Sequence, residues 1–113
     1  MVREIKESDW KLFRQLHGIA LERFSQRVLE EVRLAATDAK DGYHGCYLKV
    51  YALIRSRDQT MAHAFNDPKR SMAIIQLANI VEEGLLTDDE LKQFSAETRE
   101  AVEVIEHMRH RNP

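Results

Sequence analysis

The sequence predicts an all-α fold, a compact antiparallel bundle of four to five helices. Only 4 Gly and 2 Pro occur in 113 residues, so few positions interrupt long helices. Apolar residues recur every three to four positions over most of the chain, which is the period of an amphipathic helix. The length fits a single helical domain covering residues 1–113.

The first two expected helices form a long hairpin. Ser8 is the expected N-cap of the first, which runs from about Asp9 to Ala36 with apolar residues along one arc. An Asp-Gly pair and a second glycine mark residues 37–45 as a loop. The second helix follows over residues 43–65. Its expected buried seam comprises Tyr43, Tyr47, Val50, Ile54, Met61 and Phe65.

The third expected helix covers about residues 68–83. Asp67 is suited to cap it and Pro68 to fill its first turn, where a missing N–H costs nothing. This segment is apolar over most of its circumference, so we expect it to pack against both helices of the hairpin.

Two short helices complete the expected bundle and close one end of it. Gly84 ends the third helix, and Thr87 with Glu90 has the spacing of a capping box. Ser95 is the expected N-cap of the last helix.

Residues 77–94 combine a helix, a glycine, a Leu-Leu-Thr step and an acidic turn that leads to Phe94. This pattern resembles the short SHOCT motif of some bacterial proteins, over less than a fifth of the chain. The resemblance implies oligomerisation. The basic residues that usually follow the aromatic residue of that motif are absent here.

Composition argues against several classes of protein. Net charge is −2, with 17 basic and 19 acidic residues, so nucleic-acid binding is not expected. There is no apolar run of about 20 residues to span a membrane and no secretory signal pattern, and the lone Cys46 suits a reducing compartment. We therefore expect a cytoplasmic protein.

No cofactor or metal site is expected. His44 and Cys46 lack a second ligand pair, and the spacing of Glu103, His107 and His110 falls on an exposed helix face near the end of the chain.

Five polar residues interrupt the apolar arcs of the hairpin: Arg27, Glu31, His17, Arg57 and Asp58. Arg27 and Glu31 are interpreted as a sign that the far half of the first helix is less buried or is covered by another subunit. Arg57 and Asp58 flank the line from Ile54 to Met61, where a charge is costly unless it is paired or reaches water. His17 lies on the apolar arc of the first helix, and a His17–Asp58 pair is conceivable if the two helices pack antiparallel. His17, Arg57 and Asp58 are interpreted either as structural contacts or as a charged groove between helices.

Lys69 and Arg70 extend this hypothesis to a second position. Both lie at the corner where the third helix is expected to begin, and exposed N–H groups at a helix start can bind an anion. The alternative is a solvated basic corner.

The leading functional expectation is a small interaction or regulatory protein that works through helical surfaces. The sequence contains no nucleophile elbow, Gly-rich phosphate loop or complete metal set. Apolar surface is generous for this length, so a homodimer or another protein partner is expected to cover the excess. The alternative is a small-molecule or anion binder, or an enzyme, that uses His17, Arg57 and Asp58.

Overall fold

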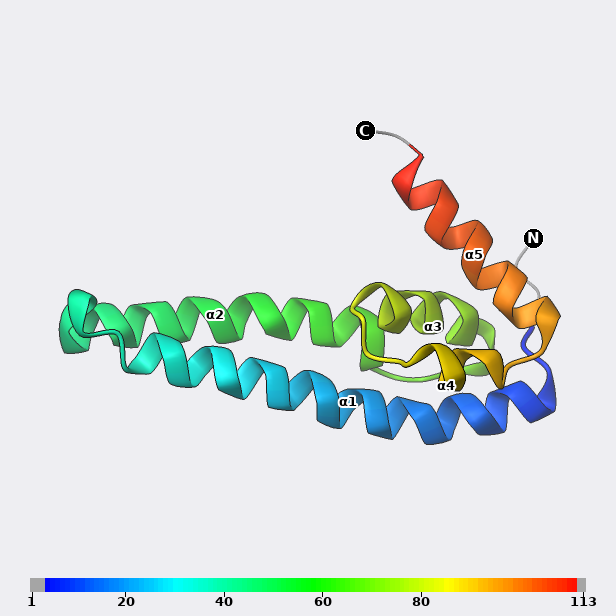
Figure 1. The fold of residues 1–113 in the computed structure, drawn as a ribbon, viewed down its shortest axis with the longest axis horizontal. Coiled ribbons are helices and arrows are strands. Elements are labelled where there is room, and N and C mark those ends of the chain that lie inside the picture. Colours follow the sequence, from blue (N-terminus) through cyan, green and yellow to red (C-terminus); the bar gives the residue numbers. More distant parts are fainter. Residues whose placement is uncertain (1–3, 112–113) are drawn as a thin grey trace.

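The computed structural model describes residues 4–111, and within this range the all-α class is confirmed. Residues 4–111 form five α-helices and no strand: α1 (Glu7–Ala36), α2 (Gly42–Phe65), α3 (Ala73–Glu82), α4 (Asp88–Lys92) and α5 (Ala96–His110) (Figure 1). Two short 3₁₀ turns, Ala39–Asp41 and Arg70–Met72, precede α2 and α3.

The helices α1 and α2 form the expected antiparallel hairpin, and α3, α4 and α5 gather at its open end (Figure 1). The molecule is elongated, with extents of 51 × 33 × 25 Å. Its radius of gyration is 16.7 Å, whereas about 13 Å is usual for a compact chain near this length. This elongation arises because the half of the hairpin nearest the turn consists of α1 and α2 alone (Figure 1).

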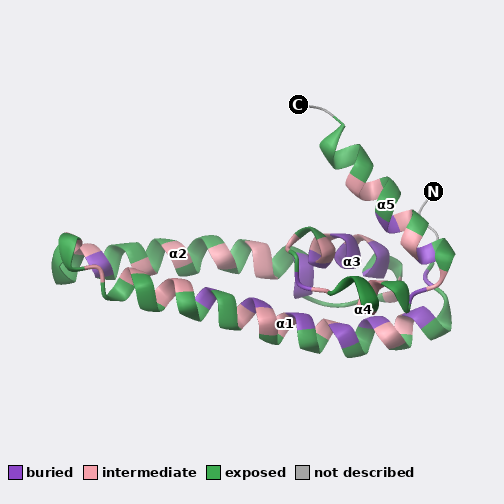
Figure 2. Cartoon of the chain, viewed as in Figure 1, coloured by how far each residue is buried: buried purple, intermediate pink, exposed green. Residues whose placement is uncertain are grey.

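The hydrophobic core lies where the hairpin meets the shorter helices. Buried positions follow one side of α1 and most of α3 (Figure 2). The largest fully buried side chains come from α1, α3, α5 and the segment before α5: Phe13, Phe24, Leu77, Ile80, Phe94 and Val102. The third helix packs against α1, α2 and α5, as its apolar circumference indicates.

The expected buried seam of α2 is wrong over its first half. Tyr43 is 99% exposed and Tyr47 66% exposed, and the buried residue in this stretch is Cys46. Only α1 lies beside this half of α2 (Figure 1). A narrow line of α2 side chains therefore contacts α1, and the side chains on the rest of the helix stay exposed. Val50 and Leu53 are half-buried along that line.

Two of the expected helix starts are wrong. The first helix begins at Glu7 after Lys6, which makes no side-chain capping bond, so Ser8 lies inside the helix. Asp67 adopts φ 51°, in the left-handed region, and the α-helix begins only at Ala73. The left-handed residue turns the chain between α2 and the 3₁₀ turn, so Pro68 stands outside the helix.

The other expected helix boundaries are confirmed. Gly84 has φ 70° and donates its N–H to the Val81 carbonyl, while Leu85 donates to Ile80, which is the Schellman arrangement. Both bonds of the Thr87 capping box are present. Ser95 caps α5 by accepting a hydrogen bond from the Thr98 N–H.

Candidate functional site

Arg57 forms an ion pair across the hairpin. Its Nε and Nη2 donate to the two carboxylate oxygens of Glu31 on α1, at 3.1 and 2.6 Å. The guanidinium holds the pKa of the Glu31 carboxyl below its ordinary value. About a third of each side chain is exposed, so the pair lies at the edge of the α1–α2 contact rather than inside it.

His17 is half-buried beside core residues. Its Nε2 lies 3.0 Å from the Phe65 carbonyl oxygen, and its ring packs against Phe13 and Phe65. The Asp58 side chain is exposed and forms no hydrogen bond or ion pair with any residue between 4 and 111. The structure therefore does not pair His17 with Asp58, and it does not place Arg57 and Asp58 in one groove.

Lys69 and Arg70 engage nearby carboxylates. Lys69 pairs with Asp67, and Arg70 donates to Glu7 at 2.7 Å and to the Ile5 carbonyl at 3.3 Å. The helix α3 begins at Ala73 and not at Pro68. Lys69 and Arg70 therefore do not lie beside the first N–H groups of a helix that starts at Pro68, as the anion-site hypothesis required. Four of the five predicted site residues thus engage separate partners within the chain, and the Asp58 side chain engages none of the described residues.

Arg27 and Glu31 are four residues apart on α1, but each side chain forms its hydrogen bonds with a residue outside α1 and not with the other. Arg27 donates to the Glu83 carbonyl and carboxylate at the end of α3, and Glu31 accepts from Arg57. Both side chains join α1 to a different helix rather than to each other.

A buried carboxylate on α1 is a structural feature that the sequence reading missed. Asp9 is 3% exposed and accepts hydrogen bonds from the Ser95 N–H, the Ser95 hydroxyl and the Thr98 hydroxyl. Burial raises its pKa, but the hydrogen bonds from Ser95 and Thr98 outweigh that effect and lower the pKa below its ordinary value. The available signal was the position of Asp9, four residues before Phe13 on the apolar arc.

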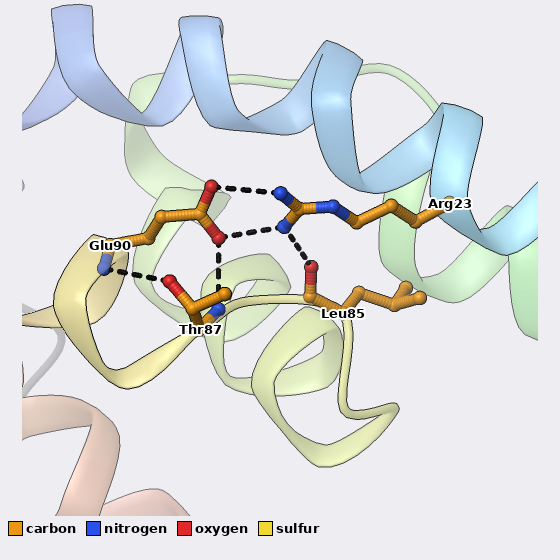
Figure 3. Close-up of polar contacts among 4 residues, drawn as sticks. All are labelled: Arg23, Leu85, Thr87 and Glu90. Atoms are coloured by element: carbon orange, nitrogen blue, oxygen red, sulfur yellow. Dashed lines mark hydrogen bonds and ion pairs between the residues drawn. The ribbon is translucent and has the colours of Figure 1, made fainter.

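A second polar cluster joins α1 to α4 (Figure 3). Arg23 donates to both oxygens of Glu90, at 2.6 and 3.0 Å, and to the Leu85 carbonyl. Glu90 also accepts from the Thr87 N–H within the capping box. The Arg23 hydrogen bond and the Thr87 backbone bond lower the pKa of Glu90 to about 2. In both clusters, donors of the chain engage both oxygens of the carboxylate.

The most prominent unpartnered surface lies on the first half of α2. We define the tyrosine face as the set of exposed residues Tyr43, Tyr47, Leu48, Tyr51 and Ile54, with exposed fractions of 99, 66, 51, 60 and 38%. At about 100° per residue these side chains occupy an arc of about 140° on one side of α2. The exposed side chains of His44, Arg55 and Asp58 fall on the same arc, so the tyrosine face combines aromatic and apolar groups with polar ones. Exposed apolar clusters with polar neighbours are typical of interaction surfaces.

Most charges around the hairpin turn are paired within the chain. Lys49 contacts Asp38 and Asp41, and Arg33 donates to Glu30. The Cys46 thiol donates to the Asp38 carbonyl. This pairing leaves Arg55 and Asp58 as the charged side chains on the arc of the tyrosine face without a partner among the described residues.

Two features are absent from the part of the chain that the structure describes. Residues 4–111 contain no group of three or more His, Cys, Asp or Glu side chains placed to hold a metal ion. Among the same residues, no helix is both long and apolar enough to cross a membrane.

Comparison of the chain with protein-family models, curated proteins and solved structures found no match. The likeness of residues 77–94 to the SHOCT motif therefore rests on those residues alone.

Proposed function

We propose that this chain is a small cytoplasmic interaction protein that acts through helical surfaces and self-associates. The observation that carries the proposal is the tyrosine face, which lies on the half of the hairpin that α3, α4 and α5 do not cover (Figures 1 and 2).

The amount of exposed aromatic surface supports a macromolecular partner. A tyrosine offers about 150–250 Å² of contact area, so the exposed parts of Tyr43, Tyr47 and Tyr51 amount to roughly 450 Å². Each partner in a standard protein interface buries about 800 Å². The tyrosines therefore supply over half of such an interface, and Leu48 and Ile54 extend it.

The internal pairing of the basic residues favours this function over anion binding. Arg57, Lys69 and Arg70 each already engage a carboxylate of the chain. An added anion would have to displace those carboxylates from three separate places.

Sedimentation velocity between about 1 and 200 µM tests the proposal. The expected result is a reversible increase in sedimentation coefficient with concentration, because association driven by roughly this area typically gives micromolar or tighter affinity. A single monomeric species over the whole range contradicts self-association.

A further inference from the structure

The residues on and beside the tyrosine face are arranged symmetrically about Tyr51. Leu48 and Ile54 lie three residues to either side of Tyr51 along α2, and Tyr47 and Arg55 lie four residues to either side. The two positions three residues from Tyr51 are thus both apolar. The two positions four residues from Tyr51 carry an aromatic ring on one side and a guanidinium on the other.

The residues seven positions from Tyr51 are also placed symmetrically about it. His44 and Asp58 each lie seven residues from Tyr51, which is two helical turns. Both are exposed, and the His44 ring stacks on Tyr47 with centroids 6.1 Å apart. Asp58 and Arg55 form no hydrogen bond or ion pair with the described residues, so both remain available to a partner.

These spacings make α2 complementary to an antiparallel copy of itself. If two α2 helices cross at Tyr51, Ile54 of each copy meets Leu48 of the other. Arg55 then lies against the Tyr47 ring, and Asp58 lies against His44. Arg over an aromatic ring and a carboxylate beside an imidazole are both favourable contacts.

A parallel arrangement would bring like groups together instead. Asp58 would meet Asp58 and Arg55 would meet Arg55 of the second copy, and like charges at such an interface are unfavourable. Closed twofold symmetry is also the commonest form of self-association.

From this arrangement we propose that the tyrosine face binds the same face of a second copy of this chain, with the two α2 helices antiparallel and the twofold axis at Tyr51. The inference rests on the proposed self-association and adds the surface, the partner and the orientation.

Orientation is tested by the distance between two spin labels in the dimer. The labels are placed at Ala62→Cys in a Cys46→Ser background, because Ala62 is exposed and lies beyond the tyrosine face. Residue 62 is eleven positions from Tyr51, so antiparallel helices separate the labels by about 30–35 Å along α2. Parallel helices would place them at about 10–20 Å, which is the interaxial distance plus the label arms.

The surface is tested by Tyr51→Arg, which places two like charges at the twofold axis. The expected result is a rise of at least tenfold in the dimer dissociation constant with unchanged helical circular dichroism. Met108→Arg is the matched control, since Met108 is an exposed apolar residue (64%) on α5, outside the face. It should leave the dissociation constant within about twofold of the parent value.

The outcomes separate this inference from the proposed function. A monomer at all concentrations overturns both. A dimer that Tyr51→Arg leaves intact overturns the tyrosine face as the interface but keeps self-association. A dimer weakened by Tyr51→Arg whose labels lie at 10–20 Å overturns only the antiparallel orientation.

Discussion

Replacement of Glu90 by Gln isolates the charge that ties α4 to α1. Glutamine keeps a side-chain oxygen that can accept the Thr87 N–H, so the capping box is retained while the ionic partner of Arg23 is lost. Glu90→Ala removes both contacts. The difference between the two variants therefore reports the contribution of the cap.

The expected magnitude follows from the lowered pKa of Glu90. A fall from 4.5 to about 2 corresponds to an upper limit of about 3 kcal/mol, at 1.36 kcal/mol per pKa unit. The Arg23 side chain is 39% exposed and that of Glu90 17%, so solvent screening reduces this value. We expect Glu90→Gln to lower the free energy of unfolding by about 1–2 kcal/mol at pH 7. Glu90→Ala should cost about 1 kcal/mol more.

The same effect predicts a dependence on pH. Because the folded-state pKa is the lower one, the ionised Glu90 contributes its full stability above pH 4.5. That stability is lost as the pH falls toward about 2. The stability difference between the parent chain and Glu90→Gln should thus fall below half its pH 7 value at pH 3.

Urea unfolding at pH 7 and pH 3, followed by circular dichroism, measures both quantities. Glu100→Gln is the control, because Glu100 is exposed on α5 and has no hydrogen-bond or ion-pair partner among the described residues. Its effect should stay within about 0.5 kcal/mol at both values of pH. A Glu90→Gln effect that is equal at pH 7 and pH 3 refutes the assignment of this stability to the ionised pair.

Three further substitutions test the packing of the bundle by the same unfolding assay. Asp9→Ala leaves the Ser95 and Thr98 donors without their buried acceptor and should cost about 2–4 kcal/mol, so a loss under 1 kcal/mol would contradict the role of Asp9. Phe13→Ala should cost about 3–5 kcal/mol, because Phe13 is fully buried, whereas Leu34→Ala, at an exposed position of α1 outside the tyrosine face, should change stability by less than about 0.5 kcal/mol. Gly84→Ala should cost about 1 kcal/mol from its left-handed backbone alone, since a Cβ there meets no neighbouring atom; a neutral result would argue against that conformation.

Local interactions made several boundaries predictable from sequence. Thr87 with Glu90, Ser95, and Gly84 each act through backbone groups within a few residues, so their spacing alone identifies the helix ends. The turn after α2 was less predictable. Asp67 adopts a left-handed backbone where its sequence favours a helix cap, and the side chains of Gln76 and Asn79 reach back to carbonyls of Asn66 and His63.

The candidate site was harder to predict because ion pairs form between helices. Arg57 could be recognised as a charge on an apolar arc, but its partner, Glu31, lies 26 positions earlier on α1. Asp58 is excluded locally, because adjacent side chains on a helix do not face each other, but no local signal selects Glu31 among the acidic residues of α1. The choice depends on the rotation of α1 against α2.

What the sequence by itself determined is the set of helices and most of their ends, because periodicity and capping are local properties of the chain. Only the tertiary structure decided which apolar faces are covered. The tyrosines of α2 repeat with the same spacing as core residues, yet they are exposed because α3, α4 and α5 pack at the other end of the hairpin. A helical period shows that a face is apolar, but burial requires a neighbour, and the position of that neighbour is set by contacts distant in the chain.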